Sequence, residues 1–202
     1  DNWFQFGTNS SGQPLYWRII RVNGDGTVRL IYNGASTQSI SSSTQIESRE
    51  FNNTTAANNM YVGYMYTDGY VHGLQNNSTI KNSVDNWYRY NLSEYDTYLN
   101  GNTGFCGDRE PSSSSNEIDG QGGTGTTQTY YAAYIRLQAN KSPDLHCLND
   151  DDLYTTVGSS SGNKALTYPV GLITADEMAM AGAVIGYMNV DYYLYTGKSY
   201  WS

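Results

Sequence analysis

Residues 15–32 read LYWRIIRVNGDGTVRLIY, and this stretch decides the fold class. Two runs rich in β-branched and aromatic residues flank NGDG at 23–26, a cluster that supplies the positive φ angles of a tight turn. The pattern predicts a β-hairpin. Three arginines lie within it, Arg18, Arg21 and Arg29. We expect them to be solvated cross-strand partners rather than a clamp for a ligand.

A further strand and a helix are predicted on either side of the hairpin. The strand, Trp3 to Phe6, precedes it across a polar loop. In residues 78–92, apolar side chains recur at the spacing of one helix face, and Ser78 is the expected N-cap. These side chains are Ile80, Val84, Trp87, Tyr88 and Leu92. We expect an amphipathic helix that packs Trp87 inward and continues as another helical turn over 93–99.

Two more helices are predicted nearer the end of the chain. Residues 129–138, TYYAAYIRLQ, favour helix over strand because of the paired alanines. Thr174 and Glu177 match a reciprocal capping box, in which each side chain bonds to the other residue's backbone amide. This spacing predicts a helix that begins at Thr174. The side chains expected to face the core are Met178, Ala181 and Ile185.

Together these segments predict an α+β fold for a single domain, residues 1–202, with a twisted antiparallel sheet, two or three helices and long irregular loops. Hydrophobic periodicity disappears in 33–59, which we expect to be a surface excursion. Residues 107–128 are rich in Gly and Ser and are expected to form a second one. Residues 60–71, MYVGYMYTDGYV, fit a strand or an aromatic loop equally well, with a turn at their Asp-Gly pair.

Composition excludes several classes of partner. Charged residues make up 15% of the chain and the net charge is -8, so no basic stripe is available for nucleic acid or for an anionic membrane. The chain has 20 Tyr against 4 Phe and 4 Trp, and tyrosine suits wet interfaces. The sequence starts at Asp1 and contains no apolar run of about 20 residues. We therefore expect a mature or trimmed product without membrane insertion.

The chain contains two cysteines, Cys106 and Cys147. A Lys-poor composition rich in Asn, Ser and Tyr indicates an exported protein, and in an oxidising compartment the two thiols are expected to pair. Such a disulfide contributes about 4 kcal/mol by chain-entropy reasoning. The only imidazoles are His72 and His146, too few for a zinc site without carboxylates. We expect no metal ion and no cofactor.

No arrangement of residues predicts catalysis. His146 and Cys147 are adjacent, and neighbouring residues of a strand point to opposite faces. Asp150–Asp152 could bind Ca²⁺ together with Asn149, but an acidic start of a helix is favoured. Four more carboxylates flank the Ser-rich loop, at Asp108, Glu110, Glu117 and Asp119. A flexible loop does not hold two carboxyls at a fixed separation, so we expect these to be solvated and expect no catalytic residue.

Four segments together resemble a known group of proteins. They are LYWRIIRVNGDGTVRLIY, STIKNSVDNWYRYNL with GFCGDR, ALTYPVGLITADEMAMAG, and YYLYTGKSYWS. The chain resembles largely uncharacterised exported and surface proteins of Gram-positive gut bacteria, some with prepilin-like N-termini. The likeness covers most of the chain except 33–59 and 110–128. More distantly, this group is similar to C-type-lectin-like domains, which implies a C-type-lectin-like fold and supplies no catalytic residue.

The last segment, residues 192–202, is aromatic throughout. We expect a terminal hairpin or strand pair around residues 196–198. Its candidate ligand-binding residues are Tyr192, Tyr193, Tyr195, Tyr200 and Trp201. In the similar proteins, further short aromatic strands follow this point and close the sheet. Without them an open edge and an aromatic face would form a template for pairing.

These observations predict a function in binding. The first expectation is an extracellular, cell-surface domain that binds a glycan or a protein through Tyr- and Trp-rich loops and serves adhesion. The second is a globular subunit of a pilus or filament, which binds copies of itself through the uncovered C-terminal strand. Neither is an enzyme.

Overall fold

The predicted hairpin forms the largest sheet of the computed structural model, which describes residues 2–53, 61–112 and 130–202. Strands β1 (Trp3–Thr8), β2 (Pro14–Val22) and β3 (Val28–Tyr32) pair antiparallel in the order β1-β2-β3. The tight turn forms as expected, with Gly26 at a φ of 84° and its amide 3.0 Å from the Asn23 carbonyl oxygen. Hence the hairpin and the strand before it are confirmed.

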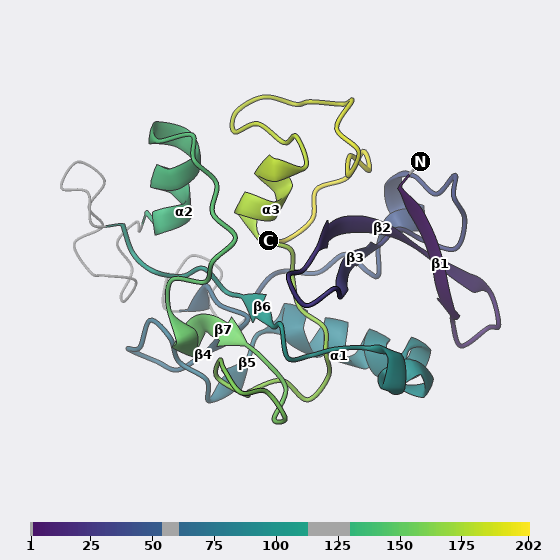
Figure 1. Ribbon diagram of the computed structural model, residues 1–202, viewed down its shortest axis with the longest axis horizontal. Coiled ribbons are helices and arrows are strands. Elements are labelled where there is room, and N and C mark those ends of the chain that lie inside the picture. Colours follow the sequence, from purple (N-terminus) through teal and green to yellow (C-terminus); the bar gives the residue numbers. More distant parts are fainter. Residues whose placement is uncertain (1, 54–60, 113–129) are drawn as a thin grey trace.

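Two smaller antiparallel sheets lie beside it (Figure 1). One pairs β4 (Met65–Tyr66) with β5 (Asn76–Asn77), and the other pairs β6 (Phe105–Cys106) with β7 (Leu153–Tyr154). The fold is thus α+β, as predicted, but the described strands form three separate sheets rather than one twisted sheet. Strands of two residues are too short to join these sheets into one. The Gly-, Ser- and Asn-rich loops around them contain no apolar runs that could lengthen the strands.

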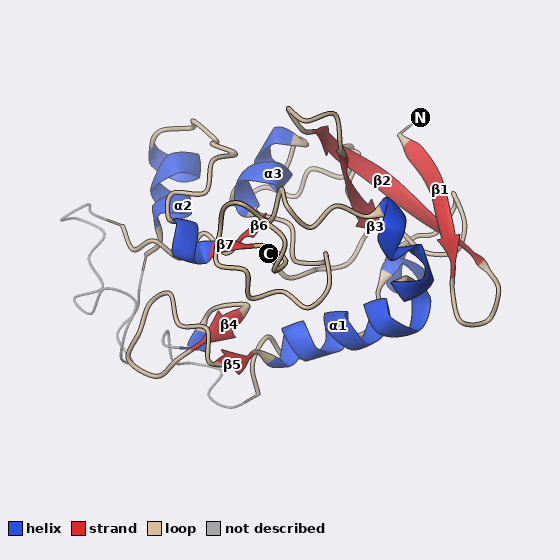
Figure 2. Ribbon diagram, turned by 60° about the horizontal axis from the view of Figure 1, so that its bottom comes forward, coloured by secondary structure: helices blue, strands red, loops and turns tan. Residues whose placement is uncertain are grey.

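Helix α1 (Thr79–Asn91) agrees closely with its prediction. Ser78 caps it by accepting a hydrogen bond from the amide of Lys81, and a 3-10 helix, Ser93–Tyr98, continues the chain. The apolar stripe faces inward, and the Trp87 ring contacts Trp17 of β2 with ring centres 6.2 Å apart. In both views α1 runs along one side of the molecule, from the small β4–β5 sheet towards β1 (Figures 1 and 2).

The later helices are shorter than their patterns indicate. Helix α2 (Ala132–Tyr134) leads directly into a π-helical turn, Ile135–Ala139, so helix is confirmed over strand. Helix α3 (Ala175–Met180) begins with the predicted capping box. It ends before Ile185, which is 50% exposed, so the core position predicted for that residue is wrong. The reason is Gly182, whose φ of 108° ends the helical path.

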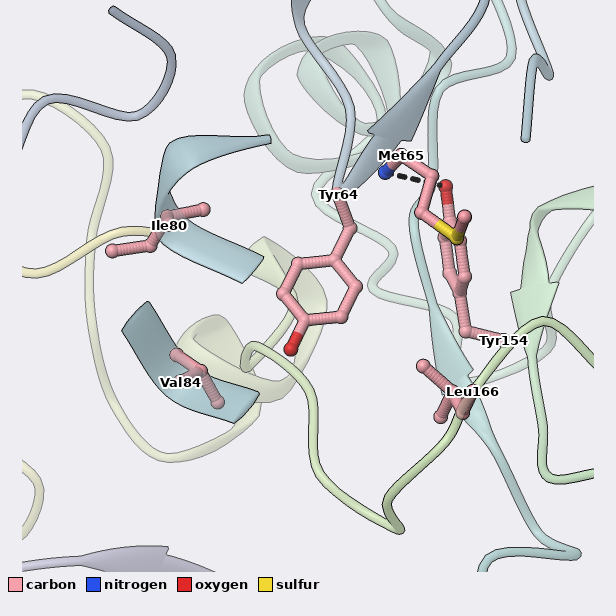
Figure 3. Close-up of a cluster of buried hydrophobic side chains, with 6 residues drawn as sticks. All are labelled: Tyr64, Met65, Ile80, Val84, Tyr154 and Leu166. Atoms are coloured by element: carbon pink, nitrogen blue, oxygen red, sulfur yellow. Dashed lines mark hydrogen bonds between the residues drawn. The ribbon is translucent and has the colours of Figure 1, made fainter. Parts of the chain in front are cut away.

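The core consists of three clusters of side chains. The first joins β4, α1 and β7 and contains Tyr64, Met65, Ile80, Val84, Tyr154 and Leu166 (Figure 3). The second lies between β2 and α1 and contains Leu15, Trp17, Tyr88 and Leu92. The third lies between α3 and the C-terminal segment and contains Ile173, Ala181 and Leu194. Helix α1 supplies residues to two clusters and so ties them together.

The two predicted surface excursions differ in outcome. In the first, 33–59, Asn33 and Gly34 are buried, so the predicted start is wrong, whereas residues 35–53 are largely exposed and contain a 3-10 helix, Ser41–Thr44. The start of the second excursion, 107–112, is half-buried or buried, so that part of the prediction is wrong. Buried ion pairs hold it, as described below. The remainders, 54–59 and 113–128, with Glu117 and Asp119, lie outside the described residues.

The buried tyrosines predict a limit of stability at high pH. Burial is the largest cause that raises the pKa of Tyr64, Tyr88, Tyr154 and Tyr200 above the ordinary value of 10.0. The folded protein therefore holds these phenol protons more tightly than the unfolded chain does. The stability they contribute is complete below about pH 10 and is lost as the pH rises through the folded-state values.

We expect the phenolate absorbance of these four tyrosines to rise together with the loss of circular dichroism, in one cooperative step above about pH 10. The same protein in concentrated urea serves as the control, because its phenols should all titrate at the ordinary value. A gradual titration of all the phenols near pH 10 with the fold intact would contradict the burial.

Candidate ligand-binding site

A pocket of about 370 Å³ opens where the two small sheets meet the C-terminal segment. This volume lies within the range of sites for small ligands, roughly 300–1,000 Å³. Its walls are mainly apolar and include six aromatic residues, Phe51, Tyr61, Tyr64, Phe105, Tyr154 and Trp201. The pocket therefore offers ring faces with few polar groups.

Strand pairing and one hydrogen bond fix the inner rings. Phe105 of β6 lies directly opposite Tyr154 of β7, so both side chains project from the same face of that sheet. The Tyr154 ring meets Tyr64 edge to face at 5.6 Å, and its hydroxyl oxygen accepts a bond of 3.2 Å from the amide of Met65 (Figure 3). These rings cannot turn without breaking core contacts.

Trp201 forms the outer part of the wall. Its indole nitrogen donates a hydrogen bond of 3.0 Å to the carbonyl oxygen of Arg49, and its ring meets Phe51 edge to face at 5.5 Å. The backbone of Phe51 is in turn held by α1, since its carbonyl oxygen accepts a bond from the amide of Ile80. Trp201 is nonetheless 48% exposed, so its ring is positioned and still open to a ligand.

The pocket contains one buried cation, Arg109, which is 5% exposed. Its Nε donates to one oxygen of Asp152 at 3.1 Å and its backbone amide donates to the other at 2.6 Å. Of the other two guanidinium nitrogens, Nη2 is buried and has no hydrogen-bond partner among the described residues. Gly63 makes room for Nη1, because a Cβ atom there would collide with the guanidinium. Arg109 is thus a buried cation in the pocket wall, paired with Asp152.

Asp152 is held by the start of a short helix. Asn149 caps the 3-10 helix Asp150–Asp152 by accepting from the amide of Asp151, so the predicted acidic helix start is confirmed. Asp152, the last of these three residues, has a second role that the acidic pattern does not indicate. Its side chain is the buried ion-pair partner of Arg109.

A histidine lies close to the carboxylates of Asp152 and Glu110. His72 Nδ1 is 3.8 Å from an oxygen of Asp152, and its Nε2 is 3.3 Å from an oxygen of Glu110. The Glu110 side chain is 44% exposed, in agreement with a solvated acidic loop. The ionisable groups beside the pocket are therefore paired mainly with one another.

Asp108 corrects the prediction of a solvated acidic loop. Arg136 binds Asp108 at 2.5 Å and Asp176 at 2.6 Å, and both carboxylates are largely buried. Burial is the main cause that raises the pKa of Asp108, and the Arg136 guanidinium opposes it. The sequence places Arg136 on a predicted helix far from this loop, so local composition could not reveal the pairing.

The hairpin arginines also differ from their prediction. Arg21 and Arg29 are register partners, and both Nε atoms lie within 3.4 Å of an oxygen of Glu177. Arg29 is buried and also donates to the carbonyl oxygen of Gly104. Of the three, only Arg18 is close to its predicted role as a cross-strand partner. Its guanidinium lies over the Trp3 ring, 3.8 Å from the ring centre. Because Glu177 of α3 pairs with both of the other two, Arg29 is buried and the Arg21 side chain is only 24% exposed.

The aromatic side chains of residues 192–202 are divided between inward contacts and the pocket wall. No strand forms in residues 192–202, so the predicted terminal hairpin is wrong. The rings turn inward instead: Tyr192 and Tyr200 share a hydrogen bond of 2.5 Å between their hydroxyls, and Tyr193 donates to the Ile20 carbonyl oxygen. Tyr195 contacts Met188 through its hydroxyl. Of the five predicted ligand-binding residues, Trp201 alone lines the aromatic pocket.

The disulfide between Cys106 and Cys147 is confirmed, with an S–S distance of 2.04 Å. Cys106 lies at the end of β6 and also lines the pocket, so the crosslink anchors one wall. Among the residues that the structure describes, no group of three or more His, Cys, Asp or Glu could hold a metal ion. Nor is any of their helices long and apolar enough to cross a membrane.

No family model, curated protein or solved structure matches the chain. The assignment of a function therefore depends on the pocket itself. Sequence reasoning missed most of its walls, because they come from six separate segments. One signal was present: the GFCGDR segment joins a cysteine to Phe105 and Arg109, and a crosslinked cysteine fixes the residues beside it.

Proposed function

We propose that this protein is an extracellular binding domain that holds a glycan or a protein segment in the aromatic pocket and serves adhesion at a bacterial surface. The observation that carries the proposal is the combination of positioned aromatic rings with a few polar lining residues, Glu50, Asn52 and Arg109. Pockets for ligands pair apolar walls with a few polar groups in this way. The disulfide supports an oxidising, extracellular compartment.

The proposal includes the fold family. A C-type-lectin-like relationship, and membership among exported proteins of Gram-positive gut bacteria, rest on the four sequence segments quoted above. Antiparallel strands, helices α1 and α3, and long loops are compatible with that relationship. The sequence predicts the ligand site on the C-terminal tyrosines, whereas we propose that it is the aromatic pocket lined by Trp201.

Binding is favoured over catalysis by the state of the ionisable groups. Both oxygens of Asp152 accept hydrogen bonds from Arg109, which leaves that carboxylate poorly placed to act as a general base. We propose on this basis that the protein transforms no substrate.

Replacing Trp201 by alanine tests the site. The protein is first screened against arrays of glycans and host proteins at high micromolar concentration, and each ligand found is then titrated with both proteins. We expect the variant to lose about 2 kcal/mol of binding energy, or about 30-fold in Kd, because tryptophans dominate such contacts. The fold should persist, because the ring is nearly half exposed.

Tyr98→Ala is the matched control, since Tyr98 is 76% exposed and does not line the pocket. It should leave Kd unchanged. Blank arrays, or an equal loss of affinity in the two variants, would count against the proposed site.

A second candidate is a filament or pilus subunit that binds copies of itself. The observation in its favour is not the predicted C-terminal strand but an exposed apolar segment that follows α3. Its exposed side chains are Met180, Val184, Ile185, Tyr187, Met188 and Val190. Apolar patches of this kind mark contact surfaces between proteins. Sedimentation at high concentration decides: a strictly monomeric protein would dismiss this candidate.

A further inference from the structure

Two rings at right angles form the outer part of the aromatic pocket. These outer rings, Phe51 and Trp201, both line the pocket, and their planes meet at 82° with the ring centres 5.5 Å apart. Trp201 is 48% exposed and Phe51 is half-buried, so part of each side chain is open to solvent. A small group in the angle between two perpendicular rings contacts the face of both, and aromatic faces carry partial negative charge.

The inner rings of the same pocket already have cations over them. The Arg29 guanidinium lies 4.3 Å from the centre of the Phe105 ring, and Lys81 Nζ lies 5.6 Å from the centre of the Tyr64 ring. In the described part of the chain, no cation of the protein lies over either outer ring. A ligand can therefore supply the cation that the outer rings lack.

The charges around the pocket also favour a positive ligand. Glu50 lines the pocket, is exposed and has no ion-pair partner among the described residues. The protein as a whole carries a net charge of -8, which attracts cations and repels anions. The cations that line the pocket or contact its rings are each balanced by a carboxylate, in the pairs Arg29–Glu177, Lys81–Asp85 and Arg109–Asp152.

The apolar lining selects one kind of cation. An ammonium or guanidinium group carries N–H donors, and each donor needs an acceptor when the group leaves water. A quaternary ammonium group has no N–H donor and presents only methyl groups, so it enters an aromatic pocket at a lower cost. Val62 and Leu172 also line the pocket and offer further apolar contacts to such methyl groups.

We propose that the pocket binds the trimethylammonium group of choline or of a choline ester, held in the angle between Phe51 and Trp201 with Glu50 as its counter-ion. This inference rests on the proposed binding function and names the ligand class of the same site. A soluble ester and a lipid head group carry the same trimethylammonium group, so the test includes both sources.

The test compares choline with 3,3-dimethylbutan-1-ol, its neutral isostere, in which a carbon atom replaces the charged nitrogen. Each compound is titrated into the intact protein, and Kd is measured from the chemical-shift changes of the protein by NMR. We expect choline to bind about 5- to 30-fold more tightly, because the isostere makes the same apolar contacts but brings no charge to the rings.

Substitutions locate the contact. Trp201→Ala should remove most of the preference for choline over the isostere, whereas Trp201→Phe, which keeps a smaller ring, should retain part of it. Glu50→Gln should weaken choline binding by about 2- to 5-fold and leave binding of the isostere unchanged. Glu94→Gln is the matched control, because Glu94 is exposed and does not line the pocket. It removes the same charge and should change neither Kd.

Two further ligands distinguish the sources of the group. Glycerophosphocholine represents a soluble ester, and vesicles of phosphatidylcholine present the same group on a lipid surface. Binding of glycerophosphocholine without co-sedimentation with these vesicles supports a soluble source, and co-sedimentation with them supports a lipid source. Vesicles of phosphatidylglycerol, which lack choline, are the control. Binding to the control vesicles would contradict the requirement for a cation.

The outcomes separate this inference from the proposed function. Equal affinity for choline and its isostere, tighter binding of the isostere, or an unchanged preference in Trp201→Ala would overturn the trimethylammonium assignment. If a ligand from the arrays then bound in a Trp201-dependent manner, the proposed function would stand alone. If no ligand bound in that manner, both would fall. Should Trp201→Ala not fold, Trp201→Phe and the comparison of the two compounds with the unmodified protein still decide.

Discussion

Replacing Glu177 by glutamine is expected to lower the free energy of unfolding by about 3–5 kcal/mol, the usual cost of removing one partner from a buried ion pair. The side chain of Glu177 is only 3% exposed, and it lies within 3.4 Å of Arg21 and 3.3 Å of Arg29. Two arginines directly opposite each other on paired strands repel, and this carboxylate compensates them. Burial already lowers the pKa of Arg29, which Glu177 counteracts.

Glutamine isolates the charge from the other role of this residue. Glu177 also completes the capping box of α3 by accepting from the Thr174 amide, and glutamine can do the same. The measured loss therefore reports the ion pairs. For a chain of this length it corresponds to a fall in Tm of roughly 6–20 °C.

Glu47→Gln is the control for an exposed pair. Glu47 binds Arg49 at 3.0 Å, with side chains 34% and 57% exposed, and such pairs contribute about 1 kcal/mol or less. Thermal unfolding of both variants by circular dichroism checks the contrast. Equal shifts in the two would mean that Glu177 does not compensate a buried charge.

The elements that the sequence predicts well are those encoded by neighbouring residues. The NGDG turn fixes the hairpin, Ser78 fixes the start of α1, and Thr174 with Glu177 fixes the start of α3. Each signal lies within a few positions of the structure that it specifies. For the same reason, Ile185 was assigned to a helix that had already ended: the pattern continues past Gly182, but the backbone does not.

Contacts between distant segments were not predictable in this way. The hairpin pattern shows Arg21 and Arg29 on a strand, but nothing in it indicates that Glu177 covers them. The same limit applies to the pocket. The sequence predicts Trp201 as a ligand-binding residue. Arg109, in contrast, lies in the predicted surface excursion 107–128, and Phe105 lies just before it. Their roles depend on the disulfide and on Asp152, both supplied from elsewhere in the chain.

The high tyrosine content predicts tyrosines at exposed binding surfaces, but some of the tyrosines belong to the buried core instead. Tyr154 and Tyr64 form core and pocket at once, because each has a buried ring and a hydroxyl that finds a partner. Tyr192 and Tyr200 bond to each other through their hydroxyls and pack, partly buried, against the third core cluster, although the sequence predicts both as ligand-binding residues. Counting tyrosines cannot separate these uses, since it does not locate the partner of each hydroxyl.

Replacing both Cys106 and Cys147 by alanine is expected to cost about 4 kcal/mol of stability. The two residues are separated by 41 positions, and the crosslink restricts the unfolded chain over that whole loop. Tm should therefore fall by roughly 8–16 °C. The double replacement avoids a free thiol, and the unmodified protein in reducing agent should show the same fall.

The same variant separates the crosslink's effect on stability from its effect on the site. Cys106 ends β6, the strand that holds Phe105 against Tyr154 at the pocket wall. Without the disulfide this two-stranded sheet loses its covalent anchor, so affinity for any ligand of the pocket should fall even at temperatures where the protein stays folded. Strand β1, which pairs only with β2 among the described strands, should keep its hydrogen-exchange protection under those conditions. An unchanged Tm together with unchanged affinity would show that the crosslink anchors neither the fold nor the pocket wall.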